Sequence, residues 1–266
     1  MVVAAKKSLG QNFLKDASIL KKIIDAAEIS PTDTILEIGP GKAALTTELL
    51  KVAGEVIAVE LDQRLIPLLR VEFCHHRNFK LVHGDALKFT PPSTPYKIVA
   101  NIPYYITSPL LNHFLLEQFQ SGNPPEMIVF MVQKEVADKI IAKREKDSVL
   151  SMEVKIFGEP EIVTYVPKEA FEPRPKVDSA VIKIRVYDKP KFTGDLKKLI
   201  WLMHISFSQK RKKLVNNLEG PLKINKDEIR KILTSCEINT DVRAEDLTLE
   251  EWQKLFNELH SNPHSF

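Results

Sequence analysis

Cysteine, glycine and long hydrophobic runs are scarce in this chain, and these shortages exclude several classes of protein. The 266 residues include 2 cysteines, Cys74 and Cys236, whose separation excludes a disulfide framework and a CxxC metal site. We therefore expect a reducing compartment, the cytoplasm. No stretch approaches the ~20 apolar residues of a membrane helix. Lys6 and Lys7 interrupt the apolar N-terminus before it reaches the length of a signal peptide, so we expect no membrane partner.

The chain also lacks a strong excess of either charge. Its 38 Lys and Arg residues stand against 35 Asp and Glu residues, a formal net charge of +3. This excess is too small to indicate a nucleic-acid partner, so the distribution of charge must decide. His75, His76 and His83 lack a further ligand at suitable spacing, and we expect no metal.

Short apolar segments alternate with helical ones up to about residue 150. Residues 19–27 have a helical apolar spacing that ends before Pro31. Continuous apolar runs of strand length follow at 34–38, 56–60, 80–82, 97–100 and 126–132. Such runs separated by helices are typical of a mostly parallel sheet covered on both faces. The predicted fold class is therefore α/β.

The pattern changes beyond residue 150. We expect β-rich segments at 153–157, 161–166 and 179–187, around a proline-rich loop at 167–176. After a linker at 188–194, the apolar period is helical at 196–207, 210–218, 226–235 and 249–259. The sequence predicts an α/β domain at 1–190 and a small all-helical C-terminal domain at 191–266.

A strand, a Gly-Pro-Gly turn and a helix predict a nucleotide cradle at residues 34–46, TILEIGPGKAALT. Gly39 and Gly41 remove Cβ atoms where a ligand approaches the backbone, and the helix N-terminus offers free N–H groups. Glu60 ends the next strand, where a carboxylate can accept both hydroxyls of a ribose. Because Gly39, Gly41 and Ala44 also satisfy the dinucleotide pattern GxGxx(G/A), an NAD-dependent dehydrogenase is an alternative.

The tetrapeptide Asn101-Ile102-Pro103-Tyr104, at the end of the fourth strand, indicates a different chemistry. The exocyclic amine of a nucleobase is a poor nucleophile because its lone pair is delocalised into the ring. The Asn101 side-chain oxygen and the Ile102 carbonyl, held extended by Pro103, can accept its two N–H groups and pyramidalise the nitrogen. Tyr104 offers a ring on which the base can stack. Such positioning favours methyl transfer from a sulfonium donor without a strong base.

A series of motifs resembles the rRNA adenine N6-dimethyltransferase family in order and spacing. They are LGQNFL at 9–14, EIGPGKAALT at 37–46, Glu60, GDAL at 84–87, NIPYYITSP at 101–109, VQKEVADKI at 132–140 and FEPRPKVDSAV at 171–181. DSAV at 178–181 and RAEDLTLEEW at 243–252 make the chain more similar to the bacterial 16S rRNA enzymes than to the antibiotic-resistance methylases of the large subunit.

The resemblance implies a Rossmann-like, S-adenosylmethionine-dependent methyltransferase. Its implied substrate is a pair of adjacent adenosines in the 3′-terminal hairpin of 16S rRNA, within the immature 30S subunit, each dimethylated at N6. Methylation of the large subunit is the alternative at the level of substrate. A binding module that assists ribosome assembly without turnover is the alternative outside the enzymes.

The resemblance also assigns site residues. It implies cofactor contacts from Asn12, Leu14, Gly39, Gly41, Glu60, Leu61, Asp85, Ala86 and Asn101. It implies that Asn101, Ile102, Pro103 and Tyr104 hold the target base and that Phe171 stacks on its other face. An aromatic ring before Pro173 and Pro175 would be displayed on a stiff loop and could stack on a base. From the residues alone, a buried loop anchor is an equal alternative for Phe171, and a local turn cap is an alternative for Asp85.

The chain departs from the family pattern in two segments. Ala43 stands where many members have a glycine, and its Cβ is not expected to close the pocket. Asp147 and Ser148 replace the Tyr-Gly of a Tyr-Gly-x-Leu-Ser motif, so no detail is carried over to residues 147–151.

Basic residues are concentrated in FSQKRKKLVNNL, residues 207–218, where no acidic residue interrupts them. Such a run suits phosphates, although a solvated basic helix face is an equal alternative. Arg174 and Lys176 add charge beside Phe171. We expect a monomer whose RNA contacts come from Arg174, Lys176, Lys210, Arg211, Lys212 and Lys213.

Overall fold

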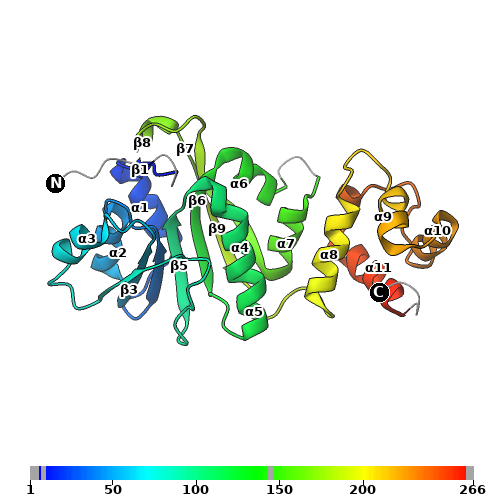
Figure 1. The fold of residues 1–266 in the computed structure, drawn as a ribbon, viewed down its shortest axis with the longest axis horizontal. Coiled ribbons are helices and arrows are strands. Elements are labelled where there is room, and N and C mark those ends of the chain that lie inside the picture. The colour runs from blue at the N-terminus through cyan, green and yellow to red at the C-terminus, as the bar shows by residue number, and fades with distance from the viewer. Residues whose placement is uncertain (1–5, 7–9, 143–145, 262–266) are drawn as a thin grey trace. The chain divides into compact units, whose positions relative to one another are not determined.

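A computed structural model describes residue 6, residues 10–142 and residues 146–261. Leu9, the first letter of the LGQNFL motif, lies outside the described residues. The chain forms two compact units (Figure 1). The first contains the described parts of Met1–Ile141 and Gly158–Asp188, and the second contains those of Ala142–Phe157 and Lys189–Phe266.

A seven-stranded sheet forms the centre of the first unit. The strand order is β4-β3-β2-β5-β6-β9-β7; the neighbours from β4 to β6 are parallel, whereas β9 is antiparallel to both β6 and β7. The strands are β2 (Thr34–Ile38), β3 (Glu55–Glu60), β4 (Phe79–His83), β5 (Tyr96–Asn101), β6 (Met127–Gln133), β7 (Gly158–Val166) and β9 (Ser179–Val186). The predicted, mostly parallel α/β sheet is confirmed.

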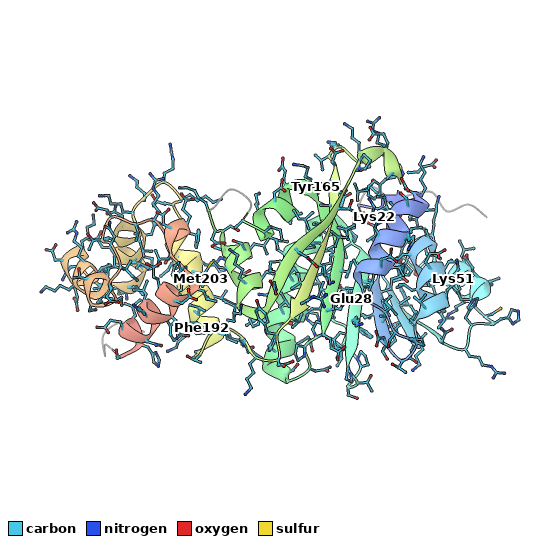
Figure 2. All side chains as sticks on the ribbon, turned by 180° about the vertical axis from the view of Figure 1, so that it is seen from behind. Lys22, Glu28, Lys51, Tyr165, Phe192 and Met203 are labelled. Carbon is cyan, nitrogen blue, oxygen red and sulfur yellow. The ribbon has the colours of Figure 1, made fainter. Side chains whose placement is uncertain are left out.

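Helices cover both faces of this sheet. On one face, α1 (Ala17–Ala26), α2 (Ala44–Val52) and α3 (Ile66–Glu72) share a buried core with strand residues such as Val99 and Val129. Figure 2, seen from behind, shows α1 in front of the strands. The other face carries α4 (Thr107–Leu111), the π-helical η3 (Asn112–Glu117) and α5 (Gln118–Ser121) (Figure 1). Because both faces are buried, these strands have continuous apolar runs instead of an alternating pattern.

The N-terminal segment of the first unit is attached to the loop around residue 171. The strand β1 (Phe13–Leu14) pairs antiparallel with β8 (Phe171–Glu172), and the N–H of Lys15 donates to the Ala170 carbonyl over 3.0 Å. The short helix η4 (Lys168–Ala170) precedes β8, and α6 (Lys134–Ile140) follows β6. This pairing connects the N-terminal segment to a loop that is distant in sequence.

Helices are the regular elements of the second unit among its described residues. Its elements are α7 (Val149–Phe157), α8 (Leu196–Ser206), α9 (Leu214–Leu222), α10 (Lys226–Ser235), η5 (Ala244–Asp246) and α11 (Leu249–Ser261). Trp252 is fully buried and stacks on Phe207, with ring centroids 6.2 Å apart. None of the helices in the described part of the chain has the length and hydropathy of a membrane-spanning segment.

The prediction of β structure at 153–157 is wrong. These residues belong to α7, whose apolar side chains are buried at Met152, Val154, Ile156 and Phe157. Apolar residues at every second position resemble a strand, but a short helix buried on several sides produces the same letters. This helix belongs to the second unit, although it precedes β7 in the chain.

The helix predicted at 210–218 begins later than expected. The first residue of α9 is Leu214, so Lys210–Lys213 lie in the turn before the helix and do not form a basic helix face. Buried Asn217 fixes this turn, because its Nδ2 donates to the carbonyls of Ser206 (2.5 Å) and Gln209 (3.2 Å). A side chain that lies within α9 therefore holds the turn that precedes this helix.

Candidate active site

A pocket lies at the carboxyl ends of the parallel strands, beside the point where the strand order changes direction. β2 is flanked by β3 on one side and by β5 on the other, which is where doubly wound sheets bind ligands. The structure places these sequence-assigned residues in the pocket lining: Asn12, Leu14, Gly39, Gly41, Glu60, Leu61, Asp85, Ala86, Asn101, Ile102, Pro103 and Tyr104. They come from the N-terminal segment and the loops after four parallel strands.

The glycine turn after β2 has the backbone that its sequence requires. Gly39 and Gly41 have φ values of 67° and 59°, in the left-handed region that L side chains disfavour. A Cβ at Gly39 would meet nothing within 4 Å, so the backbone there is open to a ligand. Ala43 also has a positive φ, 65°, which strains a residue with a Cβ. This alanine does not line the pocket, so its departure from glycine affects the backbone of the turn.

Glu60 holds the two loops of the pocket together. It is 4% exposed, and its Oε2 accepts the N–H of Gly41 over 3.1 Å while its Oε1 accepts the N–H of Asp62 over 2.7 Å. Burial raises the pKa of this carboxyl above its ordinary value. A carboxylate has about four lone-pair sites, so a ribose can still bind to oxygens that these N–H groups have oriented.

Glu37 is a pocket residue that the sequence analysis missed. It lies in the middle of β2 and is 2% exposed, and burial raises its pKa to about 8, with the Glu60 charge adding to the effect. Among the described residues, neither its Oε2 nor the buried Thr46 hydroxyl forms a hydrogen bond of normal geometry, but the nearby Thr46 hydroxyl offsets part of the rise in the pKa of Glu37. An acidic residue inside an otherwise apolar strand is the sequence signal that could have identified it.

The NIPY segment combines a fixed amide with a fixed aromatic ring. The Nδ2 of Asn101 donates to the main-chain carbonyl of Asn12 over 3.1 Å, and within the described part of the chain its Oδ1 accepts no hydrogen bond. Tyr104 begins the short helix η2 (Tyr104–Ile106), and its hydroxyl lies 2.6 Å from the Ser179 Oγ. Burial raises the pKa of this phenol, so it stays protonated. Both residues line the pocket, so a fixed ring and an amide that keeps an acceptor oxygen lie there together.

The N-terminal segment has its own anchors. The Nε2 of Gln11 donates to Asp62 Oδ2 over 3.0 Å, and Lys42 lies 4.7 Å from the centroid of the Phe13 ring. Asp62, which is 4% exposed, was also missed by the sequence analysis. Its position two residues after Glu60, where β3 has ended, was the available signal. Asp85 lines the pocket, and its Oδ1 also accepts the N–H of Leu87 over 3.0 Å, so it caps its own turn as well.

The expected display of Phe171 on a loop is wrong for this structure. The residue is 2% exposed, belongs to the buried core that α1 shares and is not part of the pocket lining. The β1–β8 pairing places it opposite Leu14 and turns its ring into the protein. Burial of the ring gains more free energy than exposure on a loop. The alternative of a buried loop anchor describes its position here.

The expected RNA-contacting residues differ in whether they form an ion pair with an acidic side chain. Arg174 forms an ion pair with Glu169 within the first unit, and Lys176 is exposed. In the second unit, Lys213 Nζ lies 2.7 Å from Asp241 Oδ1. Lys210, Arg211 and Lys212 are exposed on the turn before α9. Within the described residues, no group of three or more His, Cys, Asp or Glu side chains could hold a metal ion.

Comparison with known proteins gives a consistent picture. The model of the family "Ribosomal RNA adenine dimethylase" matches residues 2–261. The chain is 45% identical to "Ribosomal RNA small subunit methyltransferase A" of Dehalococcoides mccartyi, over 97% of this chain and 90% of that protein. It is 42% identical to the protein of that name from Listeria monocytogenes, over 96% of this chain and 90% of that protein.

Solved structures extend the similarity to the fold. A dimethyladenosine transferase from Plasmodium falciparum superimposes with a TM-score of 0.80 at 31% identity, covering 96% of this chain and 99% of that one. The 23S rRNA methyltransferase ErmE superimposes with a TM-score of 0.74 at 29% identity, covering 94% of this chain and 100% of that one. The fold is therefore the Rossmann-like fold of these methyltransferases.

Proposed function

Because the chain belongs to the ribosomal RNA adenine dimethylase family, we propose that it dimethylates the N6 amines of two adjacent adenosines in the 3′-terminal hairpin of 16S rRNA. The proposed donor is S-adenosylmethionine, and the proposed partner is the immature 30S subunit, on which the enzyme acts as a cytoplasmic monomer. One observation carries the proposal. Asn101, with its amide fixed by Asn12, lies in the same pocket as the buried Glu60 and the open glycine turn.

The residues of the pocket fit this donor. The carboxylate of Glu60 can accept both ribose hydroxyls, and the space beside Gly39 admits a ligand against the main chain. Asp85 can accept a hydrogen bond from an adenine amine between the apolar flanks of Leu61 and Ala86. When bound, S-adenosylmethionine supplies a methyl group on a positively charged sulfur, and the leaving group is a neutral thioether.

The residues of the NIPY segment would activate the acceptor. The Oδ1 of Asn101 and the carbonyl of Ile102 accept the two N–H groups of the target amine, which points the lone pair toward the methyl group. Tyr104 stacks on the base, and its contact with Ser179 keeps the ring in place. No protein base is required, because the amine loses its proton to water after transfer. Catalysis then comes from orientation and aimed acceptors.

The exposed cations of the second unit suit the RNA backbone. Lys210, Arg211 and Lys212 are exposed on a turn that Asn217 holds, and they form no ion pair with another described residue that contact with phosphates would have to break. Lys213 would add to this contact, and Arg174 and Lys176 would bind phosphates from the first unit. Recognition by shape and phosphates, with one base extruded into the pocket, is the mode that structured RNA requires.

The test is transfer of tritiated methyl groups to undermethylated 30S subunits, followed by nucleoside analysis, with mature 30S and 50S subunits as controls. We expect N6,N6-dimethyladenosine near the 3′ end of 16S rRNA. Asn101→Ala should lower the rate by at least about 100-fold, as for other removed aimed groups. Asn123→Ala is the matched control, because that amide also donates to a main-chain carbonyl, that of Pro92, but lies outside the pocket.

Each other outcome points to a defined alternative. Label confined to 23S rRNA would show a large-subunit enzyme. Absence of label with retained 30S binding, or full rescue of 30S maturation by Asn101→Ala, would show an assembly factor that works without turnover.

A further inference from the structure

A chain of contacts leads from a buried carboxylate outside the pocket to the amide of Asn101. Asp62 is 4% exposed and does not line the pocket. Its Oδ2 accepts the Nε2 of Gln11 over 3.0 Å, the next residue is Asn12, and the Asn12 carbonyl accepts the Nδ2 of Asn101 over 3.1 Å. We propose that Gln11 and Asp62 are positioning residues for methyl transfer, which hold the Asn12 carbonyl so that Asn101 presents its oxygen to the target amine. This inference rests on the proposed function.

The orientation of the Asn101 amide decides whether it can work. A carboxamide has a donor at one end and an acceptor at the other, and only the acceptor can bind the N–H of the substrate. A rotated amide would present its own N–H groups to those of the substrate. The Asn12 carbonyl prevents this rotation because it accepts from Nδ2. A main-chain carbonyl cannot be changed by substitution, so its position depends on how residues 10–14 are held.

Asn12 is held from both sides. On its C-terminal side, β1 pairs with β8, where Leu14 lies opposite the buried Phe171. On its N-terminal side, the side chain of Gln11 is attached to Asp62. Phe171 therefore contributes to the site from the core, by fixing the far end of the segment that carries Asn12.

Asp62 is itself held by several donors. Arg64 donates to the Asp62 carboxylate through Nη2 over 2.6 Å and through Nε over 2.9 Å. The main-chain N–H of Asp62 donates to Glu60 Oε1 over 2.7 Å, which also fixes its position. Hydrogen bonds from Arg64 and then from Gln11 hold the pKa of Asp62 well below its ordinary value. The carboxylate is therefore charged at neutral pH and is a rigid acceptor for Gln11.

The experiment is a double-mutant cycle with Gln11→Glu and Asp62→Asn. Gln11→Glu places two carboxylates against each other, and Asp62→Asn places an amide where a carboxylate accepts. Because Asp62 Oδ2 also accepts the Nη2 of Arg64, every variant of the cycle carries Arg64→Ala, which leaves the amide nitrogen of Asp62→Asn free to turn toward position 11. The double variant then restores one donor and one acceptor between positions 11 and 62. At saturating donor, each single change should lower kcat by ~10- to 100-fold relative to Arg64→Ala, the effect of a small displacement of a reacting group, with little change in KM for 30S subunits. The double variant should recover to within about 5-fold of Arg64→Ala.

A readout that does not need catalysis accompanies the kinetics. The side-chain N–H signal of Asn101, assigned by its loss in Asn101→Asp, should exchange with water faster in both single variants and slowly again in the double variant. Asp33→Asn is the matched control, since Asp33 accepts from Ser30 and Lys97 within the same unit but outside the pocket. It should lower the melting temperature without changing kcat or the Asn101 exchange.

The outcomes distinguish failure of the positioning role from failure of the proposed reaction. Single variants with unchanged kcat and unchanged Asn101 exchange, or a double variant that recovers neither, would overturn the positioning role. Unchanged protein that methylates no 30S subunit, but shows the expected pattern of Asn101 exchange, would refute the proposed reaction and leave the positioning contact established.

Discussion

Replacement of Glu37 by Gln should change how the stability of the first unit depends on pH. Burial raises the pKa of Glu37 from 4.5 to about 8, so between these values the folded protein keeps a proton that the unfolded chain has lost. The free energy of unfolding must therefore fall as pH rises through this window. At 1.36 kcal/mol for each pH unit, the loss attributable to Glu37 approaches about 5 kcal/mol at pH 8.

Glu37→Gln removes this titration, because a glutamine is neutral at every pH. Near pH 4.5 the two proteins should have similar stability, and above it the variant should become progressively more stable than the unchanged protein. The assay is urea unfolding at several pH values between 4.5 and 8, with circular dichroism as the signal that monitors unfolding. Both tryptophans, Trp201 and Trp252, lie in α8 and α11 of the second unit, so their fluorescence provides an internal control. A stability difference that stays constant with pH would refute the buried, protonated carboxyl.

Two further predictions concern the stability of the first unit, and a glycine of the second unit serves as a control for one of them. Glu28→Gln should show the opposite sign: hydrogen bonds from two cations of β9 lower the pKa of Glu28 to about 2, so its contribution is present above pH 4.5 and is lost as the pH falls toward 2. Acid unfolding curves of the two proteins should therefore converge near pH 2. Gly158→Ala should lower the free energy of unfolding by ~1–3 kcal/mol, since its Cβ would lie 2.7 Å from a β9 carbonyl. Gly220→Ala, in open space on α9, should instead raise stability by ~0.5–1 kcal/mol, and equal effects at both glycines would contradict the packing argument.

The parts of the site that could be predicted all follow from local sequence. Gly39, Glu60 and Asn101 each come directly after, or at the end of, an apolar run of strand length. Parallel strands place such ends at one edge of the sheet, so their meeting needs no knowledge of distant contacts. The NIPY letters then separated base methylation from dinucleotide chemistry, a choice that the glycine turn alone leaves open.

The parts that could not be predicted depend on long-range contacts or on burial. Gln11 and Asp62 are 51 positions apart, and Asn12 and Asn101 are 89 positions apart. Phe171 stands in a proline-rich segment that suggests exposure, but its pairing with Leu14 buries it. In each case the fold of other segments decides which neighbour a residue meets.

The same distinction limits what an intact motif implies about catalysis. Asn101 can serve as an acceptor only while its Nδ2 remains bound to the Asn12 carbonyl, and that carbonyl is placed by residues outside the NIPY segment. A chain that keeps Asn101, Ile102 and Tyr104 but loses the Gln11–Asp62 contact would still show every letter of the motif. Its amide would be free to rotate, and part of the population would present N–H groups to the target amine. Such a protein would bind its donor and its RNA, but it would transfer methyl groups slowly, because the cost falls on orientation in the transition state.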